Sequence, residues 1–91
     1  MKIIQSPLFG KQKKKLHKSQ IKLLDKEIKK IATSPEIGQE KKGTLSGVRV
    51  YKFHIEKQLF LIAYELDNDI LNLIMIGSHE NYYRDLSKYY S

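Results

Sequence analysis

The sequence predicts a small α+β domain in which an antiparallel sheet is covered on one face by a helical hairpin. Residues 19–33 repeat apolar side chains at helical spacing. Residues 48–76 hold three apolar runs separated by short turns, which indicates a meander of strands. The chain has 91 residues, enough for one modest core. We therefore expect one domain over residues 1–91 with elements in the order β-α-α-β-β-β-α.

The first residues are expected to form an edge strand followed by a short helix. Residues 1–6 are apolar in the middle and end before Pro7. Ser6 suits a helix N-cap, and Pro7 suits the first turn, where no backbone N–H is needed. Gly10 weakens a helix over residues 8–16, so we expect this helix to be short.

The second helix has the clearest pattern in the chain. Four apolar residues share one face of this helix: Ile21, Leu24, Ile28 and Ile31. The lysines fall mostly on the other side. The helix should end near Thr33, because Pro35 disfavours a helical conformation in the residue before it. Residues 34–47 are rich in Gly, Ser, Pro and Lys and are expected to form a loop.

The next strand alternates two kinds of side chain between its faces. Arg49, Tyr51, Phe53 and Ile55 form one set, and Val48, Val50, Lys52 and His54 form the other. The second set becomes polar toward its end, so Lys52 and His54 should point together into open space. A turn at residues 56–57 leads to a densely apolar strand, and the triplet at residues 67–69 is a hairpin signal.

The last strand is a nearly continuous apolar run, typical of a strand buried on both faces. It ends at Gly77, and His79 and the pair Tyr82-Tyr83 follow directly. Side chains that titrate, donate and stack at the end of a rigid strand are what a functional site needs. The alternative is that the tyrosines form the packing face of a last helix over residues 80–90, with His79 as its solvated cap.

The charge is large and one-sided. The formal net charge is +7; residues 1–57 hold 15 Lys and Arg against 5 Asp and Glu, whereas residues 58–91 hold 2 against 5. Such a basic surface attracts polyanions, most commonly nucleic acid. The alternative is that the lysine-rich helices are simply well solvated.

Several site classes and compartments are disfavoured by composition. The chain has no cysteine, so disulfides and thiolate metal sites are excluded and a reducing compartment is expected. The three histidines have no metal-ligand spacing, so we expect neither a metal nor another cofactor. Without a segment suited to a signal peptide or a membrane span, we expect a cytoplasmic protein.

Over nearly its whole length the chain resembles the RelE/ParE superfamily of bacterial type II toxin–antitoxin toxins. The resemblance rests on the order of elements and on three local patterns: SPEIG…KKGTLSGVRVYKF with Tyr51-Lys52, a hairpin closing on Ala63-Tyr64, and IGSHENYYRDL. It implies a RelE-like fold and a cognate antitoxin protein.

The resemblance implies two alternative activities. RelE-like members cut messenger RNA in the ribosomal A site without a metal, by attack of a 2′-hydroxyl that gives a 2′,3′-cyclic phosphate. ParE-like members poison DNA gyrase. A third alternative is a non-catalytic basic nucleic-acid-binding module. RNA cleavage is favoured because it needs a base, an acid and cations, and imidazole, with an unperturbed pKa of about 6.5, suits both proton transfers.

By position, the resemblance assigns site residues. Lys52 and His54 stand where the family has basic strand residues, and His79 where a catalytic Arg or His follows the last strand. Tyr82 or Tyr83 stands near the closing tyrosine. One departure is Leu61, where many family nucleases carry a phosphate-stabilising arginine. Further contacts to RNA phosphate are expected from other basic residues: Arg49, Arg84, Lys41, Lys42, Lys22 and Lys26.

Overall fold

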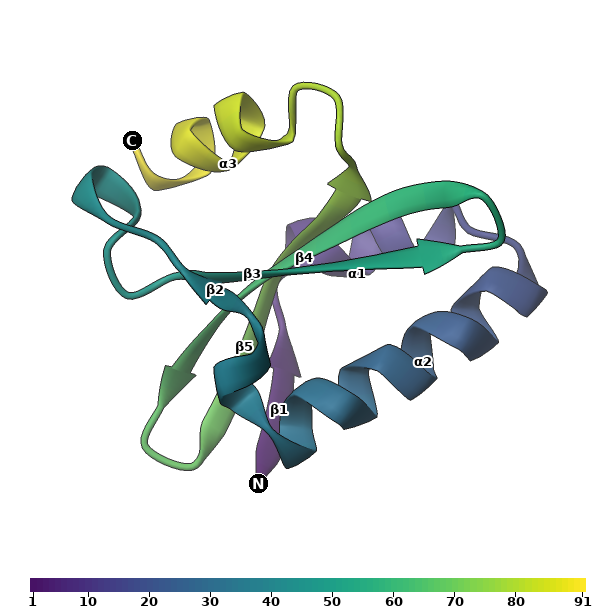
Figure 1. The fold of residues 1–91 in the computed structure, drawn as a ribbon, viewed down its shortest axis with the longest axis horizontal. Helices are drawn as coiled ribbons and strands as arrows, with labels where there is room; N and C mark the ends of the chain where they lie inside the picture. Colours follow the sequence, from purple (N-terminus) through teal and green to yellow (C-terminus); the bar gives the residue numbers. More distant parts are fainter.

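The computed structural model describes residues 1–91 and contains one five-stranded sheet with helices on both faces (Figure 1). The elements in chain order are β1 (Lys2–Gln5), α1 (Pro7–Lys14), α2 (Lys18–Thr33), η1 (Pro35–Ile37), β2 (Gln39–Glu40), η2 (Gly43–Leu45), β3 (Arg49–Ile55), β4 (Gln58–Asp67), β5 (Ile70–Ser78) and α3 (Tyr82–Tyr90). The strand order is β1-β5-β4-β3-β2, with β1 parallel to β5 and every other pair antiparallel. The expected α+β fold is confirmed.

The helical hairpin of α1 and α2 covers one face of the sheet. Phe9 of α1 and Leu24 of α2 belong to a buried cluster with Ile62 and Leu73 from the central strands. Ser6 is the N-cap of α1, as the sequence predicts. Its Oγ accepts a hydrogen bond from the Phe9 amide at 3.0 Å and donates one to the Ile74 carbonyl at 2.6 Å. The cap therefore also fixes α1 to β5.

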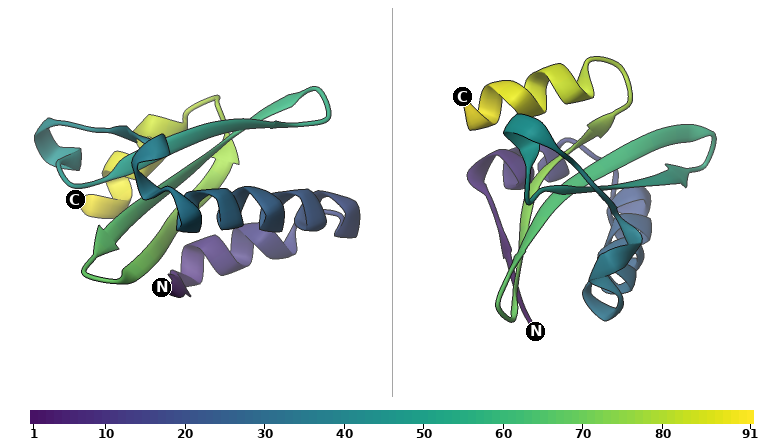
Figure 2. Two further views of the ribbon diagram at one scale, coloured as in Figure 1. Left: turned by 60° about the horizontal axis from the view of Figure 1, so that its bottom comes forward. Right: turned by 60° about the vertical axis from the view of Figure 1, so that its left-hand side comes forward.

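Helix α3 covers the opposite face (Figure 2). Tyr82 and Leu86 pack there in a second buried cluster that includes Leu61 of β4 and Met75 of β5. A bulge between β4 and β5 enlarges this cluster: Ala63 pairs with Met75 and Tyr64 pairs with Leu73, which leaves the residue between them unpaired. None of the three helices combines the length and apolar character that crossing a membrane would require.

Three details differ from the sequence expectation. The sheet is mixed and not wholly antiparallel, because β1 runs parallel to β5. The expected loop at residues 34–47 contains strand β2, whose two residues pair with Val50 and Arg49. A two-residue strand is too short to leave a periodic pattern in the sequence. The last helix begins at Tyr82 and not at residue 80, because Asn81 adopts a left-handed conformation with φ of 59°. This turn separates the end of β5 from α3.

A hydrogen bond between Tyr51 and Glu27 links β3 to α2 and makes stability depend on pH. The Tyr51 hydroxyl donates to Glu27 Oε1 at 2.6 Å. Burial, followed by this carboxylate, raises the Tyr51 pKa from 10.0 to about 12. Because the folded-state pKa lies above the unfolded value, the stability contributed is fully present below pH 10 and is lost as the pH rises toward 12.

We therefore expect Tyr51→Phe to lower the free energy of unfolding at pH 7 by about 1 kcal/mol, the typical net value of a hydrogen bond. Its difference from the wild type should shrink between pH 10 and pH 12. Urea unfolding at pH 7, 10 and 11.5 measures both effects. Tyr89→Phe, at an exposed ring, is the control at pH 7. A Tyr51→Phe difference that stayed constant with pH would contradict the role given to this hydroxyl.

Candidate functional site

Lys52 and His54 lie on the α3-side face of β3, and both are exposed. The residues on either side of each point the other way, into the core beneath α2. Across the sheet, Lys52 pairs with Leu61 and His54 pairs with Leu59 of β4. The expected placement of these two basic side chains is confirmed.

His79 lies at the same end of the sheet. Leu61 pairs with Lys52 on one side and with Gly77 on the other, so these three residues form one row across β3, β4 and β5. Adjacent strands lie about 4.8 Å apart, which puts the Lys52 and Gly77 backbones about 10 Å apart. His79 follows two residues later, exposed in the turn before α3. We call Lys52, His54 and His79 the basic strand end.

Tyr82 is a packing residue. Its side chain is 2% exposed, and its hydroxyl donates to the Met75 carbonyl at 2.7 Å. Its ring lies against Gly77, where an added Cβ would stand 3.4 Å from the nearest ring atom. Burial raises the Tyr82 pKa far above its usual value. The Tyr82 hydroxyl therefore holds α3 on β5, and this burial does not support the predicted role of Tyr82 in the site.

Tyr83 is half-buried and contributes to the surface. The Lys41 ammonium lies 4.7 Å from the centre of the Tyr83 ring, a cation–π contact worth about 0.5–1 kcal/mol. This contact joins the segment before β3 to the first turn of α3. Lys42, the next residue, is exposed. Of the two candidate tyrosines, Tyr83 is the one whose ring can meet a ligand.

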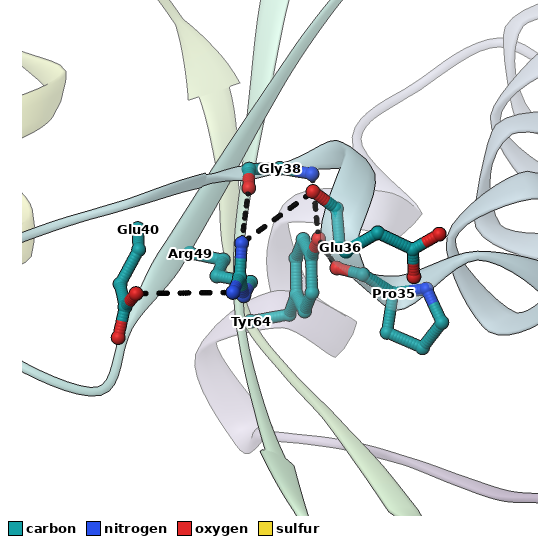
Figure 3. Close-up of polar contacts among 6 residues, drawn as sticks. All are labelled: Pro35, Glu36, Gly38, Glu40, Arg49 and Tyr64. Atoms are coloured by element: carbon teal, nitrogen blue, oxygen red, sulfur yellow. Dashed lines mark hydrogen bonds and ion pairs between the residues drawn. The ribbon is translucent and has the colours of Figure 1, made fainter.

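Arg49 holds the segment between α2 and β3 (Figure 3). By the alternation of side chains along β3, Arg49 lies on the face opposite to that of Lys52 and His54. Its Nη1 donates to the Gly38 carbonyl at 2.8 Å and to the Glu36 carbonyl at 3.4 Å. Its Nη2 also pairs with Glu40 at 3.8 Å. The predicted role of Arg49 in binding phosphate is not supported, because it lies on the other face and donates to backbone carbonyls.

Tyr64 fixes the same segment from within the core. Its hydroxyl donates to the Pro35 carbonyl and accepts a hydrogen bond from the Gly38 amide at 2.9 Å. Only glycine fits at position 38, since an added Cβ would collide with the Tyr64 hydroxyl and stand 2.8 Å from its ring. Burial raises the Tyr64 pKa, which keeps the hydroxyl neutral as a donor.

The remaining predicted phosphate ligands are scattered. Arg84 is exposed on α3 and pairs with Asp85 at 3.5 Å. Lys22 and Lys26 are exposed on α2, which covers the opposite face of the sheet from Lys52. Leu61 is fully buried under α3, so no cation stands between Lys52 and Gly77. The structure therefore places Lys52, His54 and His79 at the same end of the sheet and leaves the α2 lysines on its other face.

Comparison with known families now identifies the chain. A family model described as ParE-like toxin of type II bacterial toxin-antitoxin system matches residues 3–87. The chain belongs to this family of toxins. The resemblance to the RelE/ParE superfamily predicted from the sequence is thereby confirmed. No curated protein matches this toxin when sequences alone are compared.

Solved structures of RelE share the fold of this toxin. A chain of the E. coli RelBE toxin–antitoxin complex aligns with a TM-score of 0.69 at 18% identity, over 87% of this chain and 96% of that chain. Isolated E. coli RelE aligns with a TM-score of 0.68 at 16% identity, over 97% of both chains. A free E. coli RelE mutant gives 0.73 at 16% identity, over 94% of this chain and 90% of that chain. At these identities the likeness establishes the fold.

The Tyr64 contacts predict a local loss of order. Tyr64→Phe removes a donor to Pro35 and leaves the Gly38 amide without its partner, which should cost about 1–3 kcal/mol of unfolding free energy. Hydrogen exchange should accelerate most at the Gly38 amide. Tyr89→Phe is again the matched control. Equal exchange rates at Gly38 in Tyr64→Phe and the wild type would disprove that the hydroxyl fixes this segment.

Proposed function

We propose that this toxin is a metal-independent endoribonuclease that cleaves messenger RNA on the ribosome, and that the basic strand end is its site. The observation that supports this most is that two imidazoles and an ammonium group lie exposed at one end of the sheet. A base, an acid and a cation are the groups that the cleavage step needs. The RelE fold also supports a nuclease, since the superfamily resemblance associates that fold with messenger RNA cleavage.

In the proposed reaction, one imidazole removes the proton from a ribose 2′-hydroxyl as this oxygen attacks the adjacent phosphorus. The bond between phosphorus and the 5′-oxygen breaks, and the other imidazole donates a proton to that leaving oxygen. The products are a 2′,3′-cyclic phosphate and a 5′-hydroxyl. Lys52 stabilises the negative charge that builds on the phosphate oxygens. Tyr83 offers a ring on which an unpaired base can stack, a contact worth about 1–3 kcal/mol.

A ParE-like action on DNA gyrase is the second candidate. It is favoured by Leu61, which is fully buried where many family nucleases carry an arginine. Neither Arg49, on the other face, nor Arg84, paired with Asp85, takes that position. The description of the matching family as ParE-like also favours this candidate.

The two candidates predict different results for His79→Ala. On the nuclease proposal, loss of a proton-transfer group should slow cleavage of ribosome-bound messenger RNA by about 10²–10⁴-fold, and growth inhibition should disappear with it. The fold should persist, because His79 is exposed. His17→Ala, an exposed histidine at the start of α2, is the matched control. A folded His79→Ala protein that still arrests growth, with broken DNA and intact messenger RNA, would assign the toxin to gyrase.

The proposed function includes an antitoxin partner, as in the RelBE complex of the related fold. The net charge of +7 favours an acidic partner, since complementary charge accelerates association. We expect the association rate, measured by stopped-flow fluorescence, to fall by at least tenfold between 50 and 500 mM salt. A rate independent of ionic strength would contradict electrostatic capture.

A further inference from the structure

Strand β1 pairs with only the first half of β5. Its register ends where Gln5 lies beside Leu73, and the Ser6 amide makes the last main-chain bond, to the Leu73 carbonyl at 2.8 Å. From residue 74 to residue 78, β5 continues without a strand on this side, and Figure 1 shows β5 extending past the end of β1. Buried N–H and C=O groups without partners are costly, so this stretch of β5 needs partners of another kind.

Side chains at the start of α1 supply these partners. The Ser6 hydroxyl donates to the Ile74 carbonyl at 2.6 Å, and the Ile76 amide donates to Gln12 Oε1 at 2.9 Å. Gln12 is half-buried, and Ile76 is buried. One side chain thus donates to β5 and the other accepts from it. Together they replace the N–H and C=O groups that a longer β1 would have offered.

The two bonds lie at the bulge of β5. Leu71 and Leu73 belong to the cluster beneath α1 and α2. Ile74 and Met75, although neighbours in the chain, both belong to the cluster beneath α3, and Ile76 belongs to the first cluster again. A regular strand would change face at every residue. The extra residue at the bulge therefore exchanges the faces of all the residues that follow it in β5.

The position of the bulge decides how β5 reaches the basic strand end. With the bulge in place, Gly77 faces the Tyr82 ring, at a distance where an added Cβ would already be in contact. Without the bulge, this end of β5 would turn over and present the side chain of Ile76 to that ring. His79 follows Gly77 by two residues, so the same turn would move its imidazole relative to the neighbouring strands.

We propose that Gln12 is a positioning residue of this toxin: with Ser6 it fixes the bulge, and the bulge holds His79 at the basic strand end. Gln12 acts through the Ile76 amide, three residues before His79, and does not itself belong to the reacting groups. Displacement of a reacting group by about 1 Å can cost about 100-fold in rate. The catalytic part of this role rests on the proposed nuclease function, whereas the fixing of the bulge does not.

Gln12 is a cleaner site for the test than Ser6. The Ser6 hydroxyl also caps α1 by accepting from the Phe9 amide, so its removal would disturb the helix as well. The Gln12 side chain makes only the bond to the Ile76 amide. Gln12→Met keeps the length of the side chain but has no oxygen to accept this bond. Gln12→Glu keeps an Oε acceptor and serves as the conservative variant.

The structural part is measured by NMR on the full chain. In Gln12→Met, hydrogen exchange at the Ile76 amide should accelerate by about tenfold or more, which corresponds to loss of one hydrogen bond. Gln12→Glu should stay within threefold of the wild type, as should Lys14→Met, at an exposed position of the same helix. An unchanged rate at Ile76 in Gln12→Met, or equal acceleration of all amides in β5, would overturn the proposal.

The nuclear Overhauser effect between Gly77 and the Tyr82 ring reports on the bulge itself. In Gln12→Met it should lose at least half of its intensity, because part of the population would lose the bulge. In Gln12→Glu it should be retained. Full intensity in Gln12→Met would show that the bulge does not depend on this side chain, and would refute the proposal.

The catalytic part is measured as cleavage of ribosome-bound messenger RNA per folded molecule, with the folded fraction taken from circular dichroism. In Gln12→Met, kcat should fall by about 10–100-fold, while KM for the ribosome changes less than threefold because the basic surfaces are intact. Gln12→Glu should restore kcat to within threefold of the wild type. A residue that only stabilised the fold would leave kcat per folded molecule unchanged, and this result would refute the positioning role.

Failure of the proposed function would look different. A wild-type toxin that cleaves no messenger RNA would refute the nuclease function and, with it, the catalytic role of Gln12. The exchange rate at Ile76 and the contact between Gly77 and Tyr82 would then decide by themselves whether Gln12 fixes the bulge.

Discussion

The burial of β4 on both faces is the constraint on which the rest of the structure depends. Phe60, Ile62 and Tyr64 point into the cluster beneath α1 and α2, while Leu61 and Ala63 point into the cluster beneath α3. The two helical layers therefore pack against opposite faces of one strand. An unpaired charge in such a position would be costly, because neither face gives it access to water. Leu61, an apolar side chain that is fully buried, suits such a position.

The same constraint confines polar chemistry to the margins of the sheet. Lys52 and His54 reach solvent because β3 extends beyond the part of the sheet that α3 covers, and His79 does so because the chain has left β5. Basic side chains on α2 lie behind the sheet from these groups. The excess positive charge of the chain is thus divided between two surfaces, and a polyanion at one of them need not occupy the other.

The tyrosines illustrate how packing decides chemistry. Four of the six have a raised pKa, with burial as the largest cause in each: Tyr51, Tyr64, Tyr82 and Tyr90. Their hydroxyls donate to backbone carbonyls or to glutamates, including Glu65 for Tyr90. These four join helices and the η1 turn to the sheet as neutral hydrogen-bond donors.

The sequence alone determined the two N-terminal helices, the three-stranded meander and the exposure of Lys52 and His54, because these follow from local periodicity, capping and turn residues. Tertiary structure decided that Tyr82 is buried whereas Tyr83 reaches the surface, and that Arg49 binds carbonyls of the η1 segment. It also decided that β2 pairs only part of the β3 edge. These features depend on contacts between residues far apart in the chain, such as the hydrogen bond between Gly38 and Tyr64 and the packing of Tyr82 in one buried cluster with Leu61. No short sequence window contains both partners of such long-range contacts, so their outcome is visible only once the sheet has formed.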